Sequence, residues 1–468
     1  MPQARDVSAA LGGFIRRSGY LRKWLILGVT IGVIAGLGAV VFYLALDYAG
    51  QFFLGYLAGY HIPKPLGDGG DAGSSGFERP WAIPLVVFGG ALMSAFLVNK
   101  FAPEAEGHGT DSAIEAVHTD PRAIRVRAIV VKTIASALTI GSGGSGGREG
   151  PAAQISAGFG SLLARRLDLS DEDGRVAVSL GIGSGIGAIF GAPLGGAVLA
   201  ASIVYREDFD YRALIPGFIT SATAYAVLGS ILGFEPLFGF LATDFRFDHP
   251  LDLAWYVPLG VLAAAVGYLY ARIFYGTVAL TAKLPGNKVI KPALGGLAVG
   301  LLALLIPQIL ASGYGWAQKA ADTDTLLAMP LWIVLILPLA KIVATSLSIG
   351  TGGSGGIFGP GVVIGAFVGA ALWRVGHELG APGLPDGPAV FVVVGMMACF
   401  GSVAHAPLAV MIMVAEMTGS FSVIPCAMVA VGLAYLIITR TDVSIYRSQR
   451  LNRETAEAER RRDEATEP

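Results

Sequence analysis

Ile140–Pro151 reads IGSGGSGGREGP, and Ile349–Pro360 reads IGTGGSGGIFGP. Nine of the twelve positions are identical, at a constant offset of 209 residues. Lys132 and Lys341 each lie nine residues before the first glycine of their motif. Two more landmarks recur in the same order: Ala192-Pro193-Leu194 with Ala406-Pro407-Leu408 and, more loosely, Gly107-His108-Gly109 with Gly313-Tyr314-Gly315. The chain is therefore predicted to consist of two homologous halves.

The composition is that of a membrane protein. Of 468 residues, 54% are hydrophobic and 14% are charged, whereas soluble domains average about 25% charged. Trp24–Leu46 contains no charged residue and is long enough to cross a bilayer core of about 30 Å as a helix. Shorter apolar candidates are Trp81–Leu97, Leu214–Leu232, Trp255–Tyr270, Leu294–Leu310, Leu331–Leu347, Gly361–Leu372, Val390–Phe400 and Ile424–Ile438. We expect an all-α polytopic membrane protein with tilted and broken helices around a cavity.

The duplicated motifs have the chemistry of an anion site. Glycine runs expose backbone N–H groups, and a helix N-terminus carries about half a positive charge. Pro151 and Pro360 end the two motifs, and proline suits the first turn of a helix. We expect two helices, one from each half, to point their N-termini at one place and bind an anion without a fixed cation. For each single glycine, close helix packing is the competing interpretation.

Glu149 is an ionisable residue in an apolar region, which makes it a functional candidate. Its carboxylate is predicted to occupy the anion position as a gate and to leave when it is protonated or displaced. The second half has Phe358 at the matching position, so the carboxylate serves one half only. The competing interpretation is a charge that stabilises the helix N-terminus.

Several other functions find little support in the sequence. The net charge of −1 argues against a nucleic-acid partner, and no metal cluster or Ser/His/Asp arrangement predicts an enzyme. Cys399 and Cys426 lie in apolar segments and are expected to be packing residues. Gly141–Gly146 and Gly350–Gly355 fit G-x-G-x-x-G, but without a βαβ context a membrane enzyme with a dinucleotide site is a remote alternative. A non-conducting scaffold is equally remote, because it gives Glu149 no role.

Clusters of Lys and Arg set the expected orientation. They place both termini in the cytoplasm and the loop Pro63–Pro80 outside. The predicted parts are a cytoplasmic segment at 1–23, membrane repeat 1 at 24–232, an extramembrane linker at 233–253, membrane repeat 2 at 254–440 and a cytoplasmic segment at 441–468. The repeats are expected to have inverted topologies.

With these residues in view, the chain resembles the CLC family of chloride channels and chloride/proton antiporters. Residues 147–151 are similar to the family's GREGP signature, 356–360 to GIFxP, and Tyr446 to the tyrosine whose hydroxyl contacts the central anion. The resemblance implies a CLC-type fold and a homodimer with one pore per subunit in a cell (inner) membrane. It implies bound chloride, with no other cofactor and no metal. It also implies a gate at Glu149 and an anion site drawn from His108, Gly109, Arg148, Gly150, Gly356, Ile357, Phe358 and Tyr446.

Three positions complicate the resemblance. His108 stands where the family's anion-contacting serine falls; it is expected to donate a hydrogen bond and to gain charge near pH 6.5, or to turn away and leave a backbone N–H to bind the anion. Ile203 stands where family antiporters carry an internal glutamate, and isoleucine cannot carry a proton. Glu416 matches the neighbouring Ser202 in the second repeat and is expected to bond to backbone, with a substitute proton relay as the alternative.

These positions shape the functional prediction. The absence of a carboxylate at Ile203 favours a chloride channel or a weakly proton-coupled conductor gated by Glu149. The chloride/proton antiporter is the alternative. Selectivity among chloride, nitrate, bromide and fluoride is left open, although Tyr446 argues against the fluoride-specific branch. The C-terminal segment is too short for the paired cystathionine-β-synthase-type domains that many eukaryotic members append, and its Glu/Arg-rich run at 454–468 is expected to form a solvated, frayed helix.

Overall fold

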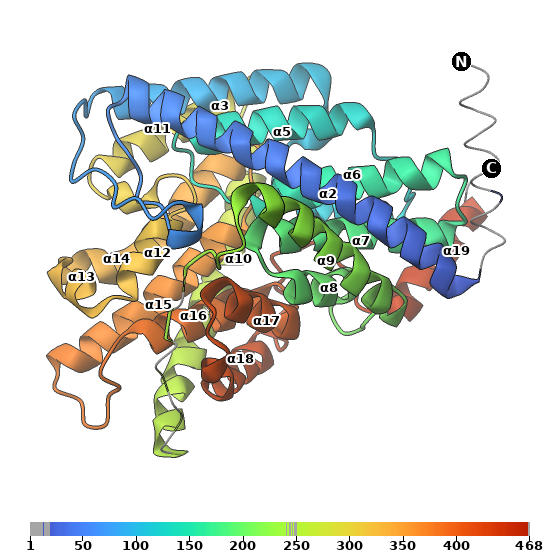
Figure 1. The fold of residues 1–468 in the computed structure, drawn as a ribbon. Coiled ribbons are helices and arrows are strands. Elements are labelled where there is room, and N and C mark those ends of the chain that lie inside the picture. The colour runs from blue at the N-terminus through green and yellow to red at the C-terminus, as the bar shows by residue number, and fades with distance from the viewer. Residues whose placement is uncertain are drawn as a thin grey trace.

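The computed structural model describes Gly13 and residues 19–466, except 240, 243–244, 246 and 248–249. Within this part of the chain every regular element is a helix, as predicted. Most of the predicted segment 1–23 and several residues of the predicted linker lie outside the described residues. Figure 1 shows helices that cross one another at different tilts around a shared interior.

Among the described residues, seven helical segments are long and apolar enough to cross a membrane. They are α2 (Tyr20–Gly50) with the π-helical turn η1 (Gln51–Leu57), α3 (Ala82–Phe101), α9 (Tyr211–Leu232), η4 (Pro250–Trp255) with α10 (Tyr256–Lys283), α14 (Leu331–Ile349), α15 (Phe358–Glu378), and η6 (Phe421–Val423) with α18 (Ile424–Ile438). Every apolar stretch predicted from the sequence overlaps a helix.

The other helices are shorter or richer in glycine and polar residues. In the first half they are α4 (Thr110–His118), α5 (Val126–Gly141), α6 (Glu149–Arg166), α7 (Asp171–Phe190) and α8 (Pro193–Ser202). In the second half they are α11 (Ile290–Ala303), α12 (Tyr314–Ala320), α13 (Thr323–Ala328), α16 (Ala389–Val403) and α17 (Pro407–Thr418), and α19 (Arg453–Thr466) follows. The helix predicted for the charged run near the C-terminus is present as α19.

The order of elements in the first half recurs in the second. A long helix, a shorter helix, a 3₁₀ turn and a short helix precede the glycine motif in both: α2, α3, η3 (Pro103–Ala105) and α4, then α10, α11, η5 (Pro307–Ile309) and α12. The motif then separates α5 from α6 in one half and α14 from α15 in the other, and three more helices follow. This recurrence supports the duplication, while the exact repeat boundaries stay a prediction.

One predicted apolar stretch is interrupted. Leu294–Leu310 is not a single helix, because α11 ends at Ala303 and a 3₁₀ turn starts at Pro307. Proline disfavours the helical conformation of the residue before it, so the chain breaks here and turns inward. The break places η5 beside Lys341, which donates a hydrogen bond to the carbonyl of Ile309.

Glycines let the central helices approach closely. A Cβ on Gly181 of α7 would lie 2.5 Å from the carbonyl oxygen of Ser156 on α6, and a Cβ on Gly365 of α15 would collide with the carbonyl of Gly395 on α16. For these glycines the packing interpretation holds. Cys399 and Cys426 are buried free thiols, which agrees with their predicted packing role.

Candidate functional site

The two glycine motifs meet where α6 and α15 begin. Gly147 and Gly356 form a reciprocal antiparallel bridge, in which the N–H of each donates to the carbonyl of the other at 2.7 Å. The two glycines hold matching positions in the duplicated motif. A contact between equivalent residues is what a twofold axis between inverted repeats produces, and it brings the two helix tips together.

Two hydroxyl pairs repeat this twofold relation. Ser136 Oγ lies 3.0 Å from Ser354 Oγ, and Thr345 Oγ1 lies 2.9 Å from Ser145 Oγ. Ser136 matches Thr345 along the sequence, and Ser145 matches Ser354. All four side chains are buried, so the same polar contact joins the halves twice.

Lys132 and Lys341 brace the two loops that lead into the site. Lys132 Nζ donates to the carbonyls of Ala105 at 3.1 Å and Gly107 at 2.7 Å. Lys341 Nζ donates to the carbonyls of Ile309 at 2.9 Å and Ala311 at 2.7 Å. Both lysines are fully buried, and their donors bind backbone carbonyls. These lysines hold the backbone in place.

The lysine contacts shift one predicted match between the halves, that of Gly107-His108-Gly109 with Gly313-Tyr314-Gly315, by two residues. Because Gly107 corresponds to Ala311, Gly109 corresponds to Gly313, and not to Gly315 as the sequence spacing indicated. Gly109 and Gly313 both have φ of +84° and both precede a short helix, a backbone conformation that glycine adopts without strain. The matching glycines therefore make the same turn in both halves.

Three of the predicted anion-site glycines lie where backbones crowd together. A Cβ on Gly150 would meet Gly356 Cα at 2.9 Å and collide with the carbonyl of His108. A Cβ on Gly109 would lie 2.9 Å from the carbonyl of Gly150. Gly109, Gly150 and Gly356 are thus held together in space, as the prediction of one shared site requires.

Glu149 is fully buried between the two helix tips. Its Oε2 accepts the N–H of Gly359 at 3.0 Å, and its Oε1 accepts the hydroxyl of Tyr314. Gly359 is in the first turn of α15, so a carboxylate from the first half binds an N-terminal amide of the second half. The carboxylate occupies the kind of place where an anion is predicted to bind. Tyr314 was not predicted as a site residue, although it stands between the two glycines of Gly313-Tyr314-Gly315.

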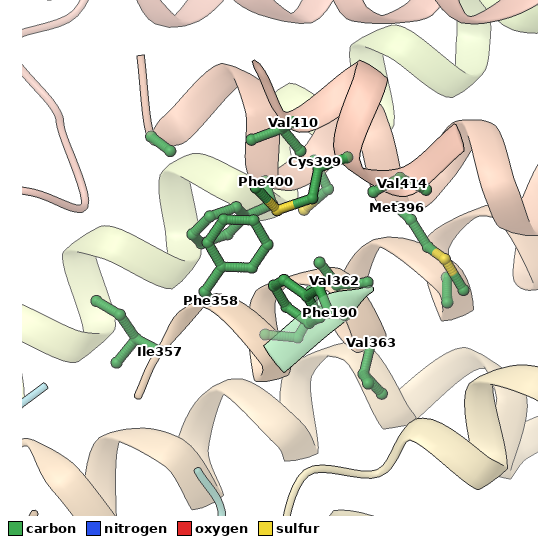
Figure 2. Packing of buried hydrophobic residues seen from close by; sticks show 14 of the residues in the cluster. Phe190, Ile357, Phe358, Val362, Val363, Met396, Cys399, Phe400, Val410 and Val414 are labelled. Carbon is green, nitrogen blue, oxygen red and sulfur yellow. The ribbon is translucent and has the colours of Figure 1, made fainter. Parts of the chain in front are cut away.

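Phe358, at the matching position of the second motif, has apolar surroundings. Its ring centroid lies 4.3 Å from that of Phe400 and 5.1 Å from that of Phe190. Figure 2 shows Phe358 among these rings and neighbouring valines, with Ile357 pointing to the other side. The N–H groups of Ile357 and Phe358 precede the first complete turn of α15, so the helix offers them no acceptor.

The side chain of Arg148 pairs with a carboxylate outside the glycine motifs. Its guanidinium forms an ion pair with Asp68 at 3.0 Å, and it lies over the rings of Tyr43 and Tyr314 at 5.4 and 5.5 Å. The side chain is buried and its charge is paired. The guanidinium therefore binds the Asp68 carboxylate, and not the anion that was predicted as its partner. Participation of the Arg148 backbone in the anion site stays a prediction.

His108 and Tyr446 lie together at the other end of the site. Their ring centroids are 5.8 Å apart, and both side chains are buried, at 6% and 1% exposure. His108 Nε2 lies 3.1 Å from Asp111 Oδ2. Two polar atoms here, His108 Nδ1 and Tyr446 Oη, are buried without a hydrogen-bond partner. Both atoms are free to contact a ligand bound between them.

Two cavities lie at equivalent places in the two halves. One, of about 150 Å³, is lined by residues that include Ile140, Gly141, Ala311, Ser312 and Arg148. The other, of about 210 Å³, is lined by residues that include Ile349, Gly350, Gly107 and His108, the counterparts of the first four. Cavities that approach one site from twofold-related directions have the arrangement of the two mouths of a transport pathway.

Ile203 and Glu416 take part in backbone contacts. Ile203 is buried, and its carbonyl accepts the side-chain amide of Gln449 at 3.0 Å. The oxygens of Glu416 accept the N–H groups of Leu194 at 3.0 Å and Gly195 at 2.7 Å. Glu416 thus caps the N-terminus of α8 from the other half, which agrees with the predicted bond to backbone.

A family model described as "Voltage gated chloride channel" matches residues 90–439, which is more than half of the chain. The chain belongs to the CLC family. A curated CLC relative, the H(+)/Cl(−) exchange transporter ClcA of Yersinia pseudotuberculosis, is 30% identical over 414 residues, covering 86% of this chain and 81% of that protein. A putative chloride channel protein, ClcB-like, of Ralstonia nicotianae is 30% identical over 372 residues, covering 78% and 85%.

Solved CLC structures share the fold. A slow cyanobacterial Cl⁻/H⁺ antiporter has a TM-score of 0.75 at 22% identity and covers 95% of this chain and 99% of its own. A CLC-type fluoride/proton antiporter has a TM-score of 0.75 at 21% identity and covers 92% and 98%. The chain is therefore an integral membrane protein of the CLC type that transports anions, and it is not an enzyme.

Proposed function

We propose that the chain exchanges chloride for protons, with Glu149 as the group that carries the proton. The observation that carries the proposal is the position of the Glu149 carboxylate, buried between the tips of α6 and α15 and bonded to the Gly359 amide. An anion and this carboxylate compete for the same amides. An ionised Glu149 therefore excludes the anion, while a protonated carboxyl group gives up the amide and lets the anion enter.

The contacts define the order of events. Protonation weakens the bonds that Glu149 accepts from Gly359 and Tyr314, because a neutral carboxyl is a poorer acceptor than a carboxylate. The side chain then swings away, and the anion takes the freed N–H groups at the start of α15. Departure of the anion and deprotonation restore the buried carboxylate. One turn of this cycle moves a proton and an anion in opposite directions when each exits through a different cavity.

Two observations bear on the choice between exchanger and channel. Ile203 has no proton to give, which favours a channel or a weakly coupled conductor. The exchange transporter of Yersinia pseudotuberculosis is similar along most of its length, which favours exchange. A route for protons that bypasses position 203 reconciles the two, because coupling then depends on Glu149 and on water in the cavities.

Proton movement in liposomes tests the proposal. Vesicles that contain purified protein and a high internal chloride concentration are diluted into low chloride, and external pH is recorded while the membrane potential is controlled. We expect wild type to drive protons inward against a proton gradient as chloride leaves. We expect Glu149→Gln to release chloride without proton movement. Chloride release by wild type with no proton movement would establish the channel interpretation.

The assembly and orientation are proposed with the same function. A homodimer with one pathway per subunit, in the cell (inner) membrane and with both termini in the cytoplasm, follows from the family resemblance and from the distribution of Lys and Arg. Chemical cross-linking in native membranes, and labelling of cysteines placed at Ser74 and Ser448 from one side, test these points. Labelling of both cysteines from the same side would contradict the proposed orientation.

A further inference from the structure

The ring of His108 is anchored by one nitrogen. Nε2 lies 3.1 Å from Asp111 Oδ2, and the same carboxylate accepts the N–H groups of Ser448 at 3.1 Å and Arg447 at 3.3 Å. Backbone N–H groups are donors that cannot change role, and they favour the ionised carboxylate. An ionised carboxylate only accepts hydrogen bonds, so the proton between His108 and Asp111 belongs to Nε2.

This anchoring fixes the chemistry of the second nitrogen. When the imidazole of His108 is neutral and Nε2 carries its proton, Nδ1 has a lone pair and no proton. A lone pair repels an anion. Nδ1 becomes a donor when the ring takes a second proton and becomes an imidazolium. Nδ1 is buried and has no partner, like the neighbouring hydroxyl of Tyr446.

We propose that His108 binds an anion and a proton together, as a pair. A small monovalent anion, such as chloride, bromide or nitrate, accepts from the protonated Nδ1 and from the Tyr446 hydroxyl, and the imidazolium neutralises its charge in the buried site. Neither charge is then buried alone. The inference rests on the proposed anion site and adds a second proton-linked group to it, distinct from Glu149.

The surroundings of His108 contain charges of both signs. The titratable or charged groups that face it are Asp111 on α4, Tyr275 on α10, Tyr446 and Arg447 in the C-terminal segment, Glu106 in the same cavity, and Lys132 behind Gly107. Asp111 and Glu106 contribute carboxyl groups, and Arg447 and Lys132 contribute basic groups. A bound anion adds a negative charge beside the protonated ring.

Two other buried histidines provide a matched comparison. His118 Nε2 bonds to the carbonyl of Val204 at 2.9 Å, and His405 Nε2 bonds to the carbonyl of Val443 at 3.0 Å. Each also has an Nδ1 without a partner. Neither is among the residues that line the described cavities. A buried histidine with one free nitrogen is therefore common in this fold, and what distinguishes His108 is its carboxylate anchor beside Tyr446.

Calorimetric titration with bromide tests the inference. Glu149→Gln protein in detergent removes the gating carboxylate, and a large organic anion serves as the background salt. Titrations at pH 7.5 in two buffers with different ionisation enthalpies give the number of protons taken up for each bromide bound. We expect an uptake that approaches one proton, and an affinity that rises by up to about tenfold for each unit fall in pH, the limit for one linked proton.

Second substitutions in the Glu149→Gln protein assign the proton. His108→Ser is expected to bind bromide with no proton uptake, since a serine hydroxyl donates without titrating. Asp111→Asn is a second probe: a carboxamide also accepts or donates, so the neutral ring can carry its proton on Nδ1, and uptake is expected to fall. His118→Gln, the control, is expected to leave uptake unchanged.

Two results overturn the inference. They are undiminished proton uptake in His108→Ser, and bromide binding by the Glu149→Gln protein without any proton uptake. The absence of bromide binding in every variant is a different failure, because it overturns the anion site itself and the proposed function with it.

Discussion

The two glycine motifs have nearly the same backbone and opposite side-chain environments. Gly147 and Gly356 bond to each other as equivalent residues, and Lys132 and Lys341 brace equivalent loops. Two residues further along each chain, Glu149 bonds to polar groups while Phe358 packs against aromatic rings. The comparison indicates that the duplication produced a shared backbone geometry, and that only the first half adds a carboxylate to it, the proposed gate.

The two cavities also differ in their side chains, although they lie at equivalent places in the two halves. One contains Arg148, whose permanent charge is paired with Asp68. The other contains His108, whose charge depends on a second proton, paired with Asp111. The proposed pathway therefore has a paired arginine in one cavity and a histidine in the other. The following predictions test how far the symmetry holds.

Replacement of either buried lysine by methionine is expected to have the largest effect. Lys132→Met and Lys341→Met each remove two hydrogen bonds from an ammonium group to backbone carbonyls, at about 1.5–3 kcal/mol for each bond. We expect similar losses of thermal stability for both variants in detergent. Lys319→Met is the control, because Lys319 donates to the carbonyl of Ala72 at an exposed site. A large loss for one buried lysine and none for the other would contradict equivalent roles.

Glu149→Gln is expected to remove the gate while it preserves the scaffold. Glutamine has the shape of protonated glutamate and cannot ionise, so chloride efflux at saturating chloride should be high and nearly equal at pH 4.5 and 7.5. Wild type should be faster at pH 4.5, where the carboxyl group gains its proton more often. Efflux that depends on pH in the same way in both proteins would show that Glu149 is not the gate.

Tyr314→Phe is expected to loosen the gate by a smaller amount. The hydroxyl bonds to a charged oxygen of Glu149, and such bonds contribute about 1.5–3 kcal/mol, equivalent to roughly a 10–100-fold change in gate opening. Chloride efflux at pH 7.5 should therefore increase. Tyr60→Phe is a matched control, since its hydroxyl is buried in the same cavity lining without a partner. Equal efflux in the two variants would show that the Tyr314 hydroxyl does not hold Glu149 in place.

The hydroxyl pairs between the halves should give the smallest effects. Ser136→Ala and Thr345→Val each remove one neutral hydrogen bond at equivalent positions, at about 0.5–1.5 kcal/mol. Thermal unfolding of both variants should show small losses of similar size. A difference well beyond that range would mean that the two hydroxyl pairs contribute unequally to stability.

The sequence predicted the helix class, the duplication and the shared site because each leaves a pattern in the chain. Apolar runs and repeated glycines are visible without a structure. Helices α5–α8 were not found as spans, because they are rich in small and polar residues and are buried by protein, so hydropathy does not mark them.

The partners of the site residues could not be predicted, because they come from distant segments. Asp68 lies 80 residues before Arg148, and Tyr314 lies 165 residues after Glu149. Asp68 belongs to no recognisable motif, and Tyr314 belongs only to a loose repeat of two glycines. The same holds for Asp111, whose links to Arg447 and Ser448 cross 336 and 337 residues. Long-range polar contacts of this kind are set by the fold and leave no periodic signal.

Crystals of the Glu149→Gln protein grown with bromide test the central claim most directly. Anomalous diffraction locates the heavy anion without assumptions about its ligands. The account predicts a peak between the tips of α6 and α15, within hydrogen-bond reach of N–H groups at the start of α15 and close to Tyr446. A peak against Arg148 or a buried lysine, with the space between the tips filled by side chains, would contradict it.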